Sequence, residues 1–288
     1  MYLDTYKIEG TVNFDANPCF GNPNTFPNFQ EKLEEFKSLL KDLVCNNESK
    51  TFYKFGDGDY FFLKKQGVGS ASPGRRALSK SYNDIGHEDF VKGSKLCDYY
   101  TCEIYPENIL KFNESIPNIK IDYPAEYGYG LVANKWILKE FSGKIGLIGA
   151  DTKLNIIQNI IEAPQYQEYL GIEKFEDYIS LPQKFACDDL LATEKMVGEQ
   201  LKNSTSKIFL MGMGHVKSGL IHRLKKYTDA VFLDVGSSID ALAGIIDINR
   251  PFFGEWTNYQ IDEQNLYDGV DYLQYNKKGK HILLERLD

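Results

Sequence analysis

From residue 129 onward the chain alternates short apolar runs with segments of helical spacing, and this rhythm constrains the fold more than any other feature. In the helical segments, apolar residues recur every three or four positions. Strands that alternate with helices are typical of a parallel sheet covered by helices on both faces. The expected elements are, in order, a helix at 131–141, a strand at 144–148, a helix from about 152, a strand at 179–181, a helix at 186–201, a strand at 207–211, a helix at 215–226 and a strand at 230–234.

The sequence pattern predicts fewer helices and strands in the first half of the chain. Helical spacing begins near Gln30, and the apolar-aromatic run 51–55 predicts a strand. Residues 1–29, rich in Asn, Pro and Gly, predict an irregular arm, and residues 250–288 predict a C-terminal extension with a last strand around 281–284. Because no internal repeat or clear linker interrupts the sequence, we expect all 288 residues to form one α/β domain. Its sheet should be Rossmann-like and mostly parallel, with helices on both faces.

The amino-acid composition limits the binding partners and the cellular compartment that we expect. A formal net charge of -8 argues against extensive binding to nucleic acid or to an anionic membrane. The five cysteines are odd in number and form no Cys-x-x-Cys pair, so they indicate neither a disulfide framework nor a structural zinc site. No signal peptide is visible, and no apolar stretch is long enough to span a bilayer. We therefore expect a cytoplasmic protein.

Two aspartates separated by one glycine lie where the first expected strand stops and a helix is expected to begin, in the stretch Gly56-Asp57-Gly58-Asp59. Side chains two apart in an extended segment point to the same side, so the two carboxylates can converge on one point. The glycines let the backbone turn tightly and approach a ligand. Converging carboxylates repel each other unless a cation lies between them, and a divalent ion held by phosphate oxygens is the usual solution. The alternative is a solvated turn, because Asp and Gly are common turn residues.

Two glycine turns, 146–151 and 211–215, each follow an apolar strand and open a helix. Ligands of open α/β sheets bind beyond the carboxyl ends of the strands, where helix N-termini favour anions. The second turn resembles a dinucleotide-binding fingerprint, but Lys217 stands where the third glycine should be. This incomplete fingerprint is only weak evidence that the chain binds NAD. Asp234 lies at a suitable distance for a ribose contact, although a carboxylate at a strand end also often caps the next helix.

Taken in order, these segments resemble the glycosyltransferases of the GT-D fold. The family's Gly-Asp-Gly-Glu (or Asp) motif corresponds to 56–59, its middle strand and helix entry to 145–149 with Lys153 beyond, its proline-led polar turn to 179–186, and its glycine turn and closing Asp-x-Gly strand to 212–214 and 231–236. The resemblance covers roughly residues 53–243, with a poorly matched gap between about 74 and 127. Each motif is loose, and their collinear order is the stronger signal. The chain departs from the pattern at Asp59, where glutamate is common, at Lys54, where arginine is frequent, and at His215, where a small residue or proline is usual.

The resemblance implies transfer of a sugar from a nucleotide-sugar donor, with a UDP-sugar favoured, onto a glycan acceptor. It also implies that Asp57 and Asp59 hold Mn²⁺ or Mg²⁺, which would neutralise the charge of the departing diphosphate. The expected catalytic residues are Asp57, Asp59 and His215; the expected donor-binding residues are Lys54, Phe55, Gly56, Gly58, Arg75, Lys153, Gly212, Gly214, Asp234 and Gly236.

The acceptor side is less defined. His215, Asp151, Asp240 and Glu255 are alternative bases for an inverting reaction, whereas a retaining reaction need not use a protein base in that role. Residues 250–259 are dense in aromatic and amide side chains, which either border a sugar or pack back over the sheet.

Two other function classes use part of the same pattern. An S-adenosylmethionine-dependent methyltransferase also has a glycine turn and an acidic strand end, but it leaves the paired aspartates without a role. A non-catalytic nucleotide- or glycan-binding module is the other alternative. Hydrolysis of a nucleotide sugar that depends on Mn²⁺ distinguishes the glycosyltransferase from both.

Overall fold

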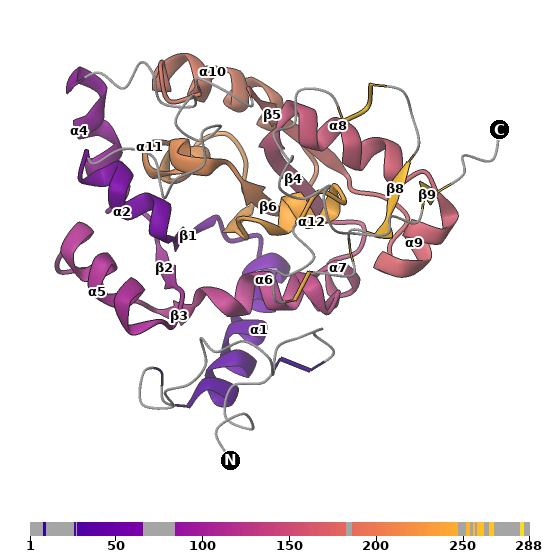
Figure 1. Cartoon of the computed structure of the whole chain (residues 1–288), viewed down its shortest axis with the longest axis horizontal. Helices are drawn as coiled ribbons and strands as arrows, with labels where there is room; N and C mark the ends of the chain where they lie inside the picture. Colours follow the sequence, from indigo (N-terminus) through magenta and orange to yellow (C-terminus); the bar gives the residue numbers. More distant parts are fainter. Residues whose placement is uncertain are drawn as a thin grey trace.

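The protein folds around one long parallel sheet (Figure 1). The computed structural model describes residues 8–9, 26, 28–65, 84–182, 186–246, 252–253, 256, 258–261, 265–267 and 283–284. The seven strands of the sheet are all parallel and lie in the order β3-β2-β1-β7-β6-β4-β5. They are β1 (Lys50–Phe55), β2 (Tyr99–Cys102), β3 (Tyr123–Pro124), β4 (Ile145–Ala150), β5 (Asp177–Leu181), β6 (Ile208–Gly212) and β7 (Val231–Asp234). The predicted parallel α/β architecture is therefore confirmed.

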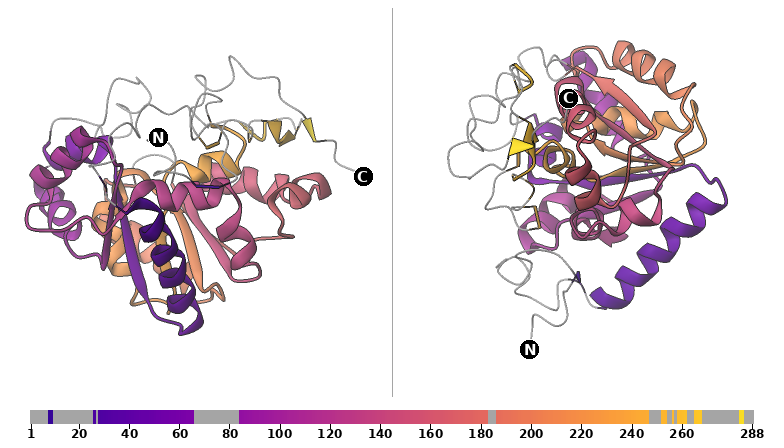
Figure 2. Two further views of the ribbon diagram at one scale, coloured as in Figure 1. Left: turned by 90° about the horizontal axis from the view of Figure 1, so that it is seen from below. Right: turned by 90° about the vertical axis from the view of Figure 1, so that its right-hand side faces the viewer.

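Helices cover both faces of this sheet, as Figure 2 shows. One face packs against α1 (Phe29–Cys45), α6 (Ala125–Ala133), α7 (Trp136–Glu140), α8 (Asp151–Ile160), α9 (Pro164–Leu170) and α12 (Ser238–Leu242). The other packs against α2 (Asp57–Leu63), α4 (Asp84–Gly93), α5 (Pro106–Ser115), α10 (Leu190–Leu201) and α11 (Lys217–Leu224).

Side chains of the central strands point alternately into these two cores. Leu233 faces the first core and its neighbour Phe232 the second, as the period of two in a strand requires. The β7 strand is buried along its whole length, and so is β4. Such continuous burial explains why the strands appear in the sequence as uninterrupted apolar runs instead of alternating ones.

Several predicted boundaries shift for local reasons. The expected helix at 131–141 is two helices, α6 and α7, because Lys135 takes a left-handed conformation (φ 64°) and the Asn134 side chain accepts a hydrogen bond from the Trp136 amide. The helix expected from 186 begins at Leu190, where the Asp189 carboxylate caps the Ala192 amide at 2.9 Å. The helix expected from 215 opens with a 3₁₀ turn, η3 (Gly214–Val216), before α11.

The described C-terminal residues pack against the first core. Phe252, Phe253 and Trp256 are all buried within it. Of the two readings of this aromatic segment, the structure therefore supports packing over the sheet for these three side chains. The last predicted strand is β9 (Leu283–Leu284), which pairs in parallel with β8 (Gln260–Ile261) in a separate two-stranded sheet. Most of the predicted N-terminal arm lies outside the described residues.

Among the helices that the structure describes, none is long and apolar enough to cross a membrane.

Candidate active site

The polar residues that the sequence singled out gather at the carboxyl ends of adjacent strands. The β1 strand lies between β2 and β7, and β6 lies on the far side of β7. As a result, the turns that follow Phe55, Gly212 and Asp234 all open at the same edge of the sheet. The carboxyl edge is where open α/β sheets hold their ligands.

The paired aspartates lie in a helix and not in an extended segment, which corrects the geometry expected from the sequence. The β1 strand ends at Phe55, and α2 begins at Asp57. Residues two apart on a helix do not face each other, so the strand-based argument for convergence does not hold. The Asp59 carboxylate turns back to accept a hydrogen bond from the Gly56 amide (2.8 Å), which caps the first turn of α2. The Asp57 side chain lies outside the described part of the structure.

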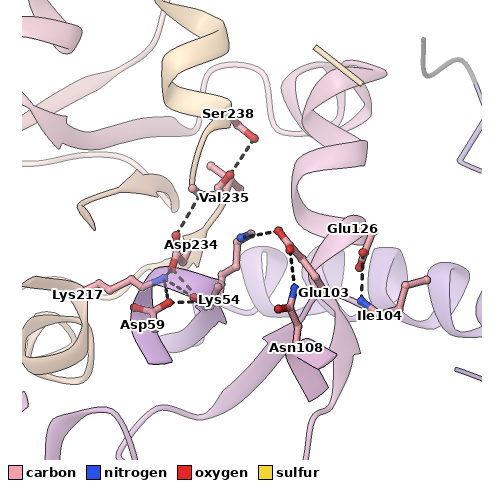
Figure 3. Close-up of polar contacts among 12 residues, drawn as sticks. Lys54, Asp59, Glu103, Ile104, Asn108, Glu126, Lys217, Asp234, Val235 and Ser238 are labelled. Atoms are coloured by element: carbon pink, nitrogen blue, oxygen red, sulfur yellow. Dashed lines mark hydrogen bonds and ion pairs between the residues drawn. The ribbon is translucent and has the colours of Figure 1, made fainter. Parts of the chain in front are cut away.

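A buried lysine ammonium organises this edge (Figure 3). Lys217 Nζ lies 3.0 Å from Asp59 Oδ2 and 2.9 Å from Asp234 Oδ2, and it donates a third hydrogen bond to the Lys54 carbonyl. These three acceptors use all three N–H donors of the ammonium. Lys217 thus joins α11 to α2, to the end of β7 and to the end of β1.

The charges in this cluster stabilise one another despite their burial. Burial alone would raise the pKa of Asp59, but the Lys217 charge, together with contacts from His215 and the Gly56 amide, holds that pKa well below its ordinary range. Burial alone would lower the pKa of Lys217, but the charges of Asp234 and Asp59 raise it above its ordinary value. Asp59 and Lys217 are therefore both ionised at neutral pH. The motif position that breaks the dinucleotide fingerprint is the one that supplies the central cation.

Asp234 is held mainly by the protein itself. One carboxylate oxygen accepts hydrogen bonds from Lys217 and from the Lys54 amide (3.2 Å), and the other accepts one from the Gly236 amide (3.0 Å). Its side chain is only 2% exposed. Asp234 therefore ties the turn after β7 to the end of β1, and its contact with a ribose stays a prediction.

His215 is the partly exposed member of the group, with 21% of its side chain accessible. Its ring stacks on Phe62 of α2, with centroids 4.8 Å apart and planes 8° apart. Its Nδ1 lies 3.9 Å from Asp59 Oδ1, a buried oxygen that forms no hydrogen bond with any residue that the structure describes. A Cβ at Gly58 would come within 2.9 Å of the His215 ring, so glycine at this position lets the imidazole lie over the start of α2.

Further expected donor-binding residues fall into three groups. Lys54 and Gly236 lie together, since a Cβ at Gly236 would be 3.4 Å from the Lys54 side chain. Lys153 lies at the carboxyl end of β4, where it pairs with Asp240 of α12. Phe55 is fully buried against Phe112 (5.3 Å between centroids), and its side chain belongs to the core.

The two glycines of the turn after β6 differ in what surrounds them. Gly214 adopts a positive φ of 59°, with open space where a side chain would be. A Cβ at Gly212 would lie 2.7 Å from the Ile239 side chain and 2.8 Å from the Gly236 carbonyl oxygen. Gly212 is therefore required by helix–strand packing, and a bulky substitution there would disturb the fold together with any ligand contact. Arg75 lies outside the described residues.

Sequence reasoning missed a second set of polar residues, beside the first. Lys54 Nζ lies 3.3 Å from Glu103 Oε1, and Asn108 donates to Glu103 Oε2 at 3.0 Å (Figure 3). Glu126, at the start of α6, accepts a hydrogen bond from the Ile104 amide (3.1 Å). These residues follow β2 and β3, in a stretch where the sequence predicted no elements. A signal was present nonetheless, because Glu103 directly follows the short β-branched and aromatic run of β2.

The described residues offer few side-chain atoms that could bind a divalent ion. In the part of the chain that the structure describes, no three His, Cys, Asp or Glu side chains gather in a way that could hold a metal. Asp59 Oδ2 accepts hydrogen bonds from Lys217 and the Gly56 amide, whereas Asp59 Oδ1 accepts none from the described residues. One oxygen of the expected pair is thus compatible with a cation, and the contribution of Asp57 stays a prediction.

Comparisons with known proteins give one likeness of fold. No family model matches the chain, and no curated protein matches its sequence. Among solved structures, the chain is similar to a protein described as a new glycosyltransferase (DUF1792) from Streptococcus sanguinis. The identity is 13% and the TM-score 0.46, over 85% of this chain and 97% of that one.

Proposed function

We propose that this protein is a glycosyltransferase that moves a sugar from a nucleotide-sugar donor, with a UDP-sugar favoured, onto a glycan acceptor. The observation that supports it is the convergence of the motif residues Asp59, Asp234 and His215 at the carboxyl ends of β1, β7 and β6. The collinear motifs of the GT-D family supply the reaction class. We also propose a cytoplasmic location, because the described cysteines, Cys45, Cys97, Cys102 and Cys187, are all free.

The chemistry matches what this edge offers. Breaking the bond between the anomeric carbon and the diphosphate places negative charge on the leaving group, and fixed positive groups lower the barrier. The Lys54 ammonium lies at this edge, and the partly exposed His215 can donate a hydrogen bond to a phosphate oxygen. Lys217 does not contact the donor in this proposal, because its donors are used within the protein. It holds α2 and β7 in place instead.

A divalent ion is part of the proposal. When bound, Mn²⁺ or Mg²⁺ would neutralise charge on the leaving diphosphate. We propose Asp57 and Asp59 Oδ1 as its ligands. The role of this chain is to hold those carboxylates at the first turn of α2, where Lys217 keeps Asp59 ionised.

A thermal-shift panel tests the donor class. The protein is heated with UDP-glucose, UDP-galactose, UDP-N-acetylglucosamine and S-adenosylmethionine, each with and without Mn²⁺. We expect at least one UDP-sugar to raise the melting temperature, with a larger shift when Mn²⁺ is present. Release of UDP from that donor then tests turnover. Binding of S-adenosylmethionine without binding of any nucleotide sugar would overturn the proposal in favour of a methyltransferase.

The metal is tested separately with Asp57→Asn. We expect this variant to lose UDP release while keeping the melting temperature of the wild type. Asp59→Glu restores the residue that is common in the family, and we expect it to keep partial activity. Undiminished turnover of the wild type in EDTA would remove the metal from the proposal and leave the donor class standing.

A further inference from the structure

Glu103 and Glu126 form a carboxylate pair beside the proposed donor site, at the ends of β2 and β3. Glu103 is the first residue after β2, and Glu126 is the second residue of α6, which follows β3 directly. Because β2 lies next to β1, this pair belongs to the same carboxyl edge as Lys54 and Asp59. The two glutamates differ sharply in exposure, and that difference separates their roles.

Glu126 is the buried member. The residue is 1% exposed, its Oε1 accepts a hydrogen bond from the Ile104 amide, and its buried Oε2 has no hydrogen-bond partner among the described residues. Burial, with a smaller contribution from the charge of Glu103, raises the pKa of Glu126 to about 8. The carboxyl therefore carries a proton at neutral pH. Since Ile104 directly follows Glu103, the Glu126 contact fixes the backbone on which Glu103 stands.

Glu103 is the accessible member. Its side chain is 24% exposed, and both carboxylate oxygens are oriented, one by Lys54 and the other by Asn108. Of the other described carboxylates at this edge, Asp59 and Asp234 are buried and paired with Lys217, whereas Asp240, paired with Lys153, and the exposed Asp151 lie toward β4, which β1, β7 and β6 separate from β2. Glu103 is thus a preorganised carboxylate that a substrate can reach. Asn108 and the ring of Tyr129, which lies 5.7 Å from Lys54 Nζ, provide amide and aromatic surfaces nearby.

We propose that Glu103 is the general base of an inverting transfer and that the acceptor hydroxyl binds at the ends of β2 and β3. This inference rests on the proposed function. The acceptor oxygen forms a bond to the anomeric carbon as the bond to the diphosphate breaks. The bonding electron pair leaves with the nucleoside diphosphate, and the hydroxyl proton passes to Glu103. Lys54 links the two halves of the site, because it contacts Glu103 and extends from the strand that precedes the donor motif.

The test compares Glu103→Gln with Glu107→Gln. Glu107 is the matched control, because it lies four residues away on α5 with an exposed side chain. The donor is the UDP-sugar that the wild type turns over, and UDP release and UDP affinity are both measured. We expect Glu103→Gln to lower kcat by about 100-fold or more, the contribution typical of a general base. UDP affinity should stay within about twofold of the wild type, since the nucleotide binds on the other side of Lys54. Glu107→Gln should match the wild type in both.

The pH profile and the stereochemistry complete the test. The acidic limb of kcat against pH should disappear in Glu103→Gln and persist in Glu103→Asp, which keeps the carboxylate. Product NMR should show inversion at the anomeric carbon. Unchanged kcat in a folded Glu103→Gln, or retention of configuration, would overturn the role of Glu103 alone. A wild type that turns over no nucleotide sugar would overturn the proposed function itself.

Discussion

At the scale of single residues, the most informative side chain is Lys217. In the sequence it breaks a glycine fingerprint and so argues against a dinucleotide site. In the structure it bridges two buried carboxylates from different elements. The Lys217 ammonium is buried and all three of its N–H donors are in hydrogen bonds. Its removal would therefore leave Asp59 and Asp234 as uncompensated charges. Lys217 therefore stabilises the fold and positions the site at the same time.

Lys217→Met keeps the length of the side chain and removes its charge. We expect the free energy of unfolding to fall by about 3–5 kcal/mol, the usual cost of breaking a buried ion pair on one side. Urea denaturation followed by circular dichroism measures the loss. Lys202→Met is the matched control, because Lys202 pairs with Glu199 on an exposed face and its loss should cost less than about 1 kcal/mol. Equal stability of the two variants would contradict the central role of Lys217.

Glu126 predicts a pH dependence of stability with a definite sign. Its pKa rises from 4.5 in the unfolded chain to about 8 in the folded one. A raised pKa contributes stability below the unfolded value, and the contribution is lost as pH rises toward the folded value. Glu126→Gln removes the ionisation. We expect the variant to gain stability relative to the wild type between pH 5 and pH 8, on the order of 3 kcal/mol. A difference that does not change with pH would show that Glu126 does not titrate in this range.

At the scale of elements, the strand-to-helix turns decide where the site lies. The sequence predicted these turns from their glycines, and the structure shows a different structural reason for each glycine. Gly58 makes room for the His215 ring, Gly214 takes a positive φ, and Gly212 lets α12 approach β6. A turn that looks like a ligand cradle can thus be required by packing alone.

Gly212→Ala tests that distinction. The added Cβ would meet Ile239 and the backbone oxygen of Gly236 at distances below 3.0 Å, so α12 must shift away from β6. We expect a loss of about 1–3 kcal/mol in thermal or urea denaturation. Gly128→Ala is the control, because its Cβ would meet nothing closer than 3.8 Å and alanine favours the helix. That variant should match or exceed the stability of the wild type. Destabilisation by Gly128→Ala but not by Gly212→Ala would contradict the packing argument.

At the scale of the whole molecule, the central position of β1 brings the site together. Its neighbours β2 and β7 are distant in the sequence: Phe52 pairs with Tyr99, 47 residues away, and with Leu233, 181 residues away. The opposite edge of the sheet also has an open pocket of about 600 Å³, at the amino ends of β4 and β5, lined in part by Ser142, Gly143, Glu173 and Glu176. The two edges offer distinguishable locations for a ligand.

Hydrogen exchange with and without UDP locates the nucleotide. We expect protection to rise in peptides covering 54–59, 212–217 and 234–238, because their amides lie at the carboxyl edge. Peptides covering 142–145 and 173–177 serve as the control for the opposite edge and should exchange at the same rate in both samples. Protection confined to these control peptides would place the nucleotide in the amino-edge pocket and contradict the proposed donor site.

The sequence by itself determined the strands after residue 143 and their parallel arrangement, because those strands are buried on both faces and are separated by segments of regular apolar spacing. It also located the edge of the sheet that carries the motif residues. It did not predict α9, α12 or the division between α6 and α7. Local patterns reach no further than one element, and the rest depended on contacts between distant segments. The bridge from Lys217 to Asp59 and Asp234 and the carboxylate pair at β2 and β3 were decided only by the tertiary structure. Charges acquire a partner and a shifted pKa only when the fold buries them side by side, and no periodicity in the sequence records that pairing.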